Sequence, residues 1–273
     1  MNTRNPFDIV NLHGEGTMRG VTLALATARV RDFLPVGLEL GEQTVTPPGT
    51  HPVVLFYHDM IRATMSIPTL LPNMTYHEHS VGVPFSYISR GSPGNRSLGP
   101  YYFMPKLYLD NFLAVVGGTW FWGFAKHPGN FVVTENSYSI SSIDGRRLTS
   151  LEWESTTAAR PIREFPHFEP IRQMLAQPMI SMLPAALGPF FFLSNFDKDW
   201  EKATVRPLRT ALEVDVEYVP SFSGGRYPHE GRSPGIDESV LGSYELRAPW
   251  RLGLLYPPGL NFHAESRSGR RTP

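Results

Sequence analysis

Residues 105–126 read PKLYLDNFLAVVGGTWFWGFAK, an almost wholly apolar and aromatic run that ends in a lysine, Lys126. Trp120, Trp122 and Phe124 alternate along it, so we expect a β-strand whose aromatic face lies beside the amine. Buried lysines are rare unless they are paired, and burial can lower the pKa of an amine by up to ~3–5 units. An amine without its proton is a nucleophile, which makes Lys126 a candidate for covalent catalysis. The alternative is a lysine that extends its amine into solvent at a strand end.

Lysine is scarce in the rest of the chain, where only Lys106, Lys198 and Lys202 occur. Lys198 and Lys202 lie in the charged stretch NFDKDWEKAT (195–204), which predicts a solvated surface. Lys106 is expected to face outward from a strand.

Composition excludes several classes of function. The 273 residues carry 25 Lys+Arg against 25 Asp+Glu, a balance that gives no electrostatic footprint for nucleic acid or an anionic membrane. There is no cysteine, so disulfides, thiolate metal sites and thiol catalysis are excluded. The N-terminus lacks an apolar core of secretory length, and the longest uncharged apolar run, 178–196, is broken by prolines. We expect a cytoplasmic protein without a membrane span.

The pattern of apolar segments predicts one β-rich domain over residues 1–262, with a polar and disordered tail over 263–273. Short runs rich in β-branched and aromatic residues predict strands at 21–28, 52–58, 76–88, 100–110, 130–135, 147–155, 189–196, 211–219 and 243–256. Helical spacing is found at 28–35 and at 167–187, with a kink expected at Pro178. The Gly/Ser/Pro-rich segment 89–99 predicts an exposed hairpin loop.

The segments LYLDN (107–111), AVVGG (114–118) and WGFAK (122–126) resemble the acetoacetate decarboxylase family, in which such a run ends in a lysine that forms a Schiff base with a keto acid. Further segments resemble the family in the same order: LPVGLEL (34–40), YHEHSVGVPFSY (76–87) and YELRAPWRLGLLYPPG (244–259). The resemblance covers about residues 18 to 257. The resemblance implies a mainly β fold: a closed, cone-like antiparallel β-barrel with flanking strands and a few helices, in a homo-oligomer. It implies chemistry through an iminium on Lys126, without a cofactor or a metal.

The resemblance also assigns roles to other residues. Glu78 matches one active-site glutamate of the family, whereas the second falls on Val53. Arg19 is the expected partner of the substrate carboxylate. His127 is expected to contact substrate, and so are Trp122 and Phe124, because alternation along a strand would place them on the face that leads to Lys126. His127 stands where the authentic decarboxylases have a second lysine. A neutral imidazole there would not repel the Lys126 ammonium, so burial would have to favour the free amine instead.

The stretch YHEH (76–79) supports Glu78 independently. On a strand, Glu78 shares a face with Tyr76, while His77 and His79 point to the other face. A carboxylate beside an amine can orient substrate or move protons. His77 and His79 together offer two imidazoles to a metal, but no third ligand follows nearby in the sequence. We expect His58 to pair with Asp59 or with the backbone rather than to act in catalysis.

Three functional hypotheses follow. The first is a Schiff-base lyase acting on a keto acid through Lys126, by decarboxylation of a 3-oxo acid or the related aldol and dehydration chemistry. Its close alternative is an aldolase-dehydratase or cyclase on a 2-oxo acid, since the same iminium stabilises an enamine. The second, of another class, is a non-catalytic barrel that binds a small ligand. The third is a metal-dependent barrel enzyme that uses His77 and His79. The expected partner is a small-molecule keto acid, with no nucleic acid and no membrane.

Overall fold

The computed structural model describes residues 11–66, 73–89, 98–155, 157–165, 168–182, 190–215, 225–227 and 242–258. The predicted tail over 263–273 and residues 90–97 of the predicted hairpin loop lie outside these ranges. Strands dominate the described chain, as the sequence predicts. Their bounds are β1 Asn11–Ala26, β2 Leu38–Leu40, β3 Thr50–Met65, β4 Met74–Ile88, β5 Leu98–Leu109, β6 Lys126–Val133, β7 Ser137–Ser142, β8 Arg147–Ser155, β9 Arg160–Pro161, β10 Met179–Met182, β11 Phe191–Ser194, β12 Phe196–Lys198, β13 Thr204–Val214, β14 Gly225–Tyr227 and β15 Gly242–Gly253.

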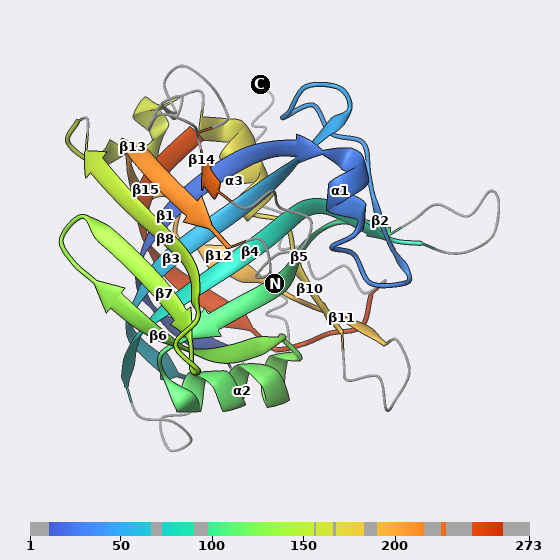
Figure 1. Ribbon diagram of the computed structural model, residues 1–273. Coiled ribbons are helices and arrows are strands. Elements are labelled where there is room, and N and C mark those ends of the chain that lie inside the picture. Colours follow the sequence, from blue (N-terminus) through green and yellow to red (C-terminus); the bar gives the residue numbers. More distant parts are fainter. Residues whose placement is uncertain are drawn as a thin grey trace, which may run out of the picture.

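The strands close into a ring. The pairing runs β5-β6-β7-β8-β13-β15-β1-β3-β4, and β4 pairs with β5 again, which completes the circuit (Figure 1). Neighbours in the ring are antiparallel except β5 and β6, which are parallel. The parallel pair needs a crossover between β5 and β6, and helix α2, Phe112–Trp122, supplies it. The predicted closed antiparallel barrel is therefore confirmed, except that β5 and β6 are parallel.

Each face of the closed sheet packs its own core cluster, because alternate residues of a strand point to opposite faces. On β3, Phe56 and Met60 belong to one cluster, whereas Leu55 and Tyr57 belong to the other. The first cluster also takes in residues of α2 and of helix α3, Glu169–Leu175. The side chains of Lys126 and Glu78 lie in a pocket between α2 and this face of the sheet.

Helix α2 corrects the strand expected through Trp120, Trp122 and Phe124. The side chain of Asn111 accepts a hydrogen bond from the Ala114 amide at 3.0 Å and caps the first turn. Gly123 ends the helix in the left-handed conformation at φ 63°. The helix lies across one end of the ring, beside β6 and β5 (Figure 1).

The helix predicted over 167–187 is also shorter than expected. Helix α3 ends at Leu175, and Met179 already belongs to β10. Pro178 has no N–H and restricts the residue before it, so the helix cannot continue through it. Its carbonyl instead accepts a hydrogen bond from the Tyr102 amide on β5 at 2.9 Å. Likewise α1, Thr27–Arg31, ends before Pro35.

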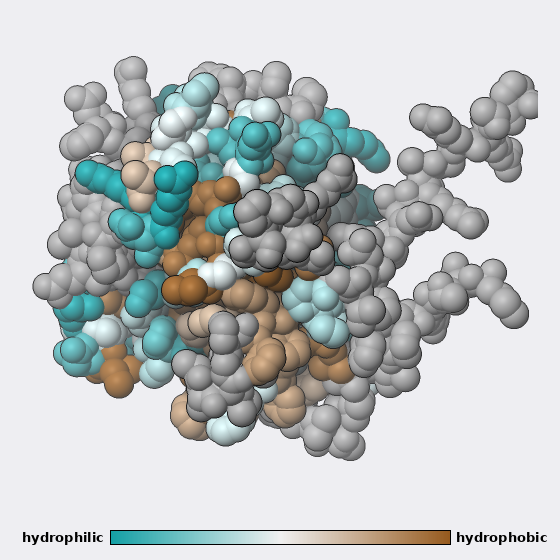
Figure 2. Space-filling view, turned by 90° about the vertical axis from the view of Figure 1, so that its right-hand side faces the viewer, coloured by the Kyte–Doolittle hydropathy of each residue, from teal (hydrophilic) through white to brown (hydrophobic). Residues whose placement is uncertain are grey.

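Hydrophobic residues gather at the centre of one face of the molecule, below a band of hydrophilic ones (Figure 2). On α2, Phe112, Trp120 and Phe121 are all exposed. Within the described ranges, no helix is long and apolar enough to cross a membrane.

Candidate active site

Lys126 is the first residue of β6, where the chain returns from α2 to the sheet. Gly123 turns the chain, the Phe124 amide donates to the Gly118 carbonyl at 3.2 Å, and Lys126 then pairs with Leu107 on β5. These contacts point the Lys126 side chain into the space beneath α2. Gly118 makes this path possible, because a Cβ atom on residue 118 would overlap the Cδ and Cε atoms of the lysine.

The amine of Lys126 meets the carboxylate of Glu78 on β4. Lys126 Nζ donates to Glu78 Oε2 at 3.0 Å, and each side chain is only 8% exposed. Burial alone would raise the pKa of Glu78, but the charge of Lys126 and contact with His58 outweigh burial and lower that pKa to about 2. Glu78 is therefore an ionised partner at neutral pH. The buried lysine is a paired one, rather than an isolated amine on an apolar wall.

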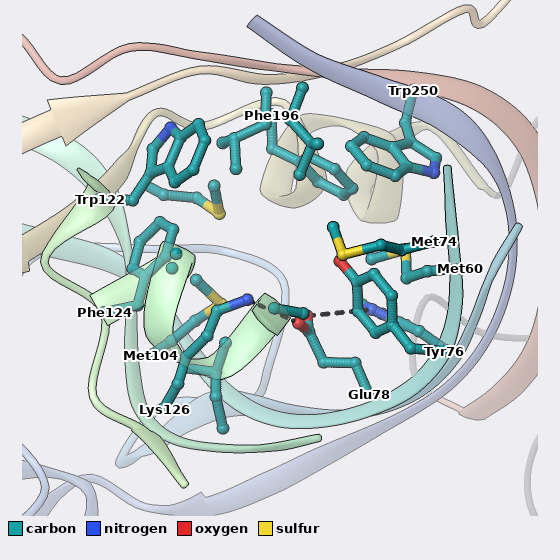
Figure 3. A pocket seen from close by; sticks show the side chains of 18 of the residues that line it. Met60, Met74, Tyr76, Glu78, Met104, Trp122, Phe124, Lys126, Phe196 and Trp250 are labelled. Carbon is teal, nitrogen blue, oxygen red and sulfur yellow. Dashed lines mark hydrogen bonds and ion pairs between the residues drawn. The ribbon is translucent and has the colours of Figure 1, made fainter. Parts of the chain in front are cut away.

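A pocket opens around this ion pair. Figure 3 shows Lys126 and Glu78 at one side of the pocket, with Trp122, Phe196 and Trp250 across it. Apart from this pair, His58 and Tyr76, its lining is mainly apolar and includes four methionines: Met60, Met74, Met104 and Met179. Methionine is a flexible side chain that fills irregular apolar space. The site thus joins one buried ion pair to a deformable hydrophobic wall.

Tyr76 and His58 also line the pocket. Tyr76 shares the face of Glu78, as strand alternation predicts, and burial together with Glu78 raises its pKa, so its hydroxyl stays neutral. His58 is the residue that sequence reasoning missed. It faces Glu78 across β3 and β4, with Nδ1 at 3.6 Å from Glu78 Oε1, and does not pair with Asp59 as expected.

Arg19 lies on the opposite face of the sheet and does not line the pocket. It is paired with Tyr57 across β1 and β3, and its guanidinium contacts Asp59 at 2.8 Å and Glu245 at 3.3 Å. Its Cζ also lies 4.3 Å from the centre of the Trp153 ring. The prediction that Arg19 receives a substrate carboxylate beside Lys126 is therefore wrong: on a strand, one step of register decides the face.

The aromatic residues before Lys126 divide between pocket and surface. Trp122 and Phe124 are buried and line the pocket, and Trp122 Nε1 donates to the Gly253 carbonyl at 2.7 Å. Trp120 is 79% exposed, because a helix places it on another side from Trp122. His127 is exposed and points away from the site, with its ring 5.3 Å from that of Tyr108. The expected substrate contact of His127 is therefore also wrong.

The alternative metal site on His77 and His79 finds no support in the geometry. His77 Nδ1 contacts Asp110 Oδ2 at 2.6 Å, and His79 Nδ1 contacts the Phe56 carbonyl at 2.8 Å. Across the described residues, no group of three or more His, Cys, Asp or Glu side chains is arranged to hold a metal ion.

Lys198 corrects another expectation, since it is buried rather than solvated. Its amine donates to the carbonyls of Leu175 and Phe196 at 3.2 and 3.4 Å. Burial lowers its pKa to about 7, partly offset by Asp197. Lys106, expected to face outward, is only partly buried.

Comparison with known proteins identifies the same family as the sequence segments quoted above. The sequence matches the family model described as acetoacetate decarboxylase (ADC) over residues 5–222. Among curated proteins, no sequence matches this chain.

Solved structures share the fold at low sequence identity. The acetoacetate decarboxylase from Legionella pneumophila subsp. pneumophila str. Philadelphia 1 is 12% identical with a TM-score of 0.54, over 95% of this chain and 94% of that one. The enduracididine biosynthesis enzyme MppR, complexed with pyruvate, is 16% identical with a TM-score of 0.53, over 89% and 88%. An acetoacetate decarboxylase-like enzyme from Sphingomonas wittichii RW1 is 16% identical with a TM-score of 0.52, over 94% and 98%.

Proposed function

The chain belongs to the acetoacetate decarboxylase family, and from that premise we propose that it is a lyase that forms a Schiff base between Lys126 and a keto acid. The observation that carries this proposal is the buried contact of 3.0 Å between Lys126 Nζ and Glu78 Oε2 at the edge of an apolar pocket. An amine and a carboxylate so placed can exchange the protons that imine formation needs.

The proposed steps use these two side chains. Because the pKa of Glu78 is low, the resting pair holds its proton on nitrogen. Starting from the ammonium, Glu78 carries two protons in turn from the nitrogen to the substrate oxygen. The first moves as the nitrogen bonds to the carbonyl carbon and turns the carbonyl oxygen into a hydroxyl, and the second moves from the same nitrogen to that hydroxyl. Water leaves and an iminium remains. Its positive nitrogen accepts the electron pair of the bond that breaks next, either the bond to carbon dioxide or a C–H bond.

We propose that the substrate carries an apolar group. The methionines Met60 and Met74, together with Phe196 and Trp250, offer hydrophobic contact well away from the reacting amine (Figure 3). Burial of an apolar substrate group against these side chains favours binding by about 25 cal/mol per Å² of apolar surface removed from water.

Aldol addition with dehydration, or cyclisation, on a 2-oxo acid is the second candidate reaction. Among the described lining residues, Lys126 is the only lysine and no arginine occurs, so a substrate carboxylate meets no guanidinium and no second ammonium there. That setting suits chemistry in which the carboxylate is not the reacting group. A structure of MppR, 15% identical and with a TM-score of 0.50, holds the condensation product of pyruvate and imidazole 4-carboxaldehyde.

We also propose that the protein forms a homo-oligomer and is located in the cytoplasm. The exposed aromatic side chains Phe112, Trp120 and Phe121 of α2 are apolar surface that a second copy would bury.

Product analysis tests the proposed reaction. The protein is incubated with 3-oxooctanoate, and separately with pyruvate plus an aldehyde. Carbon dioxide release above the spontaneous rate identifies a decarboxylase, and an unsaturated condensation product identifies the aldol-dehydration activity. If neither product forms and no oxo acid is trapped on Lys126 by borohydride, the protein is a binding barrel and the proposal is wrong.

A further inference from the structure

His58 is a buried imidazole that the steps above do not use. Its side chain is only 7% exposed, and neither ring nitrogen has a hydrogen-bond partner within the described chain. Buried polar groups are normally hydrogen-bonded, so an unpartnered one in a pocket calls for an explanation. The ring lies at the same pocket as Lys126.

Other buried histidines of the sheet are different. His51 contacts the Pro84 carbonyl, and His79 contacts the Phe56 carbonyl, both at 2.8 Å. These contacts fix each ring in the fold. His58 is held only by packing, with the Phe56 ring centre at 5.0 Å, and by the longer 3.6 Å contact with Glu78. Its ring is therefore free to bond a ligand.

One carboxylate touches both candidate proton carriers. Glu78 Oε2 contacts Lys126 Nζ, and Glu78 Oε1 faces His58 Nδ1. Two neighbouring strands fix this order, because His58 and Glu78 are direct partners across β3 and β4. Because His58 and Lys126 line the same pocket, a substrate bonded to Lys126 would lie in the space that the imidazole borders. If Nδ1–H points at Glu78, the lone pair of Nε2 is available to the pocket.

We propose that His58 is a catalytic acid and base that moves the proton at the substrate carbon next to the imine carbon. This assignment rests on the proposed Schiff-base function. In the forward step Nε2 accepts that proton, the C–H electron pair forms a C=C bond, and the C=N electron pair moves to the Lys126 nitrogen. The product is a neutral enamine beside an imidazolium, which the Glu78 carboxylate stabilises.

The same residue serves decarboxylation. There the electron pair of the C–C bond, rather than a C–H pair, forms the enamine as carbon dioxide leaves. A His58 imidazolium, protonated beforehand from water, then delivers its proton to the enamine carbon. Hydrolysis of the resulting iminium returns the amine of Lys126. Every proton comes from substrate or water, and no oxidant or reductant takes part.

The test separates proton transfer at carbon from formation of the imine. The probe is 2-oxooctanoate in D₂O. Nuclear magnetic resonance follows exchange of its hydrogens at the carbon next to the carbonyl, and borohydride with mass spectrometry follows the adduct on Lys126. In His58→Gln, exchange is expected to fall by about 10²–10⁴-fold, the typical contribution of general acid–base catalysis, while the adduct still forms. His77→Gln is the matched control, since it removes an imidazole from the opposite face of the sheet.

A second variant guards against a folding defect. His58→Ala leaves a space at the ring, and added imidazole is expected to restore exchange in it. The assignment is overturned if His58→Gln forms the adduct and exchanges at the wild-type rate. It is also overturned if adduct and exchange fall by the same factor, which would mean that His58 acts on imine formation. Absence of an adduct in the wild-type protein contradicts the Schiff-base function itself, and this assignment with it.

Discussion

Gly118 of α2 lies directly against the side chain of Lys126, so close that any Cβ at residue 118 would overlap the stem of the lysine. Because Gly118 has no side chain, the side chain of Lys126 can pass beside α2 to reach Glu78. Glycine lowers helix propensity, but at residue 118 it is needed because the lysine side chain occupies the space that a Cβ would take. No such contact requires glycine at residue 117.

This relationship predicts an unusual variant. Gly118→Ala should raise the intrinsic stability of the helix by about 1 kcal/mol, yet push the amine away from Glu78. We expect a folded protein whose rate of adduct formation falls at least about tenfold, the equivalent of some 1.4 kcal/mol. Gly117→Ala is the comparison: residue 117 also lines the pocket, but a Cβ there meets no atom within 4 Å and leaves the path of the lysine open. Equal trapping rates in the two variants would contradict the geometry.

The ion pair itself predicts a coupling between two substitutions. Glu78→Met leaves the Lys126 amine buried without its partner, which typically costs about 3–5 kcal/mol. The double variant Glu78→Met/Lys126→Met replaces both charges by apolar groups and should recover most of that loss. Urea unfolding at neutral pH measures each free energy. Additive losses in the double variant would show that the two side chains do not interact.

The same pair predicts a loss of stability in acid. The pKa of Glu78 falls from its ordinary 4.5 to about 2 in the fold, so the unfolded chain binds the proton first. The stabilisation is complete above pH 4.5 and is lost as pH falls toward about 2. The wild-type protein should lose up to about 1.4 kcal/mol per pH unit more than the double variant across this window. Parallel curves for the two proteins would refute the low pKa.

Lys198 predicts a second rise of stability with pH, in the alkaline range. Its pKa falls from 10.5 to about 7 on burial, so between these values the unfolded chain binds a proton that the folded one does not. Stability should therefore rise with pH across this range, by up to about 1.4 kcal/mol per unit. Lys198→Met should remove that rise. Denaturation midpoints of both proteins, measured from neutral to alkaline pH, check this, and an unchanged slope in the variant would count against it.

The position of His127 predicts that its replacement by lysine leaves the pH profile of kcat/KM unchanged. Its side chain is exposed and lies against Tyr108, away from the pocket. His127→Lys therefore adds a positive charge on the other side of the strand, where solvent screens it. We expect the acidic limb of the pH profile of kcat/KM to stay in place. A shift of that limb to lower pH would mean that residue 127 reaches the amine.

Strand patterns in the sequence predicted the larger part of the fold. The alternation of RLTSLEWES gave β8 with its observed bounds, Arg147–Ser155. Helix α2 was missed because FLAVVGGTWFW is apolar all round and contains two glycines, which leaves no helical period to detect. The signals that could have found it are at its ends, with Asn111 as the cap and Gly123 as the stop.

The site could be predicted only in part, for a related reason. Lys126 and Glu78 stand out because they are charged residues in apolar segments, and the structure brings them together. His58 gives no such signal, since its role depends on the register that sets it opposite Glu78 across two strands. Arg19 was assigned from the resemblance to the family, and nothing local in the sequence of β1 says which face of the strand borders α2.

The most direct test of the account is trapping of a substrate on Lys126. The wild-type protein and Lys126→Arg are each incubated with 2-oxooctanoate and borohydride, digested, and mapped by mass spectrometry. Arginine keeps the positive charge beside Glu78 but forms no imine of this kind. The account predicts a reduced adduct on the peptide that contains Lys126 in the wild-type protein, and none in the variant. Equal labelling of both proteins, or an adduct on Lys198 instead of Lys126, would contradict it.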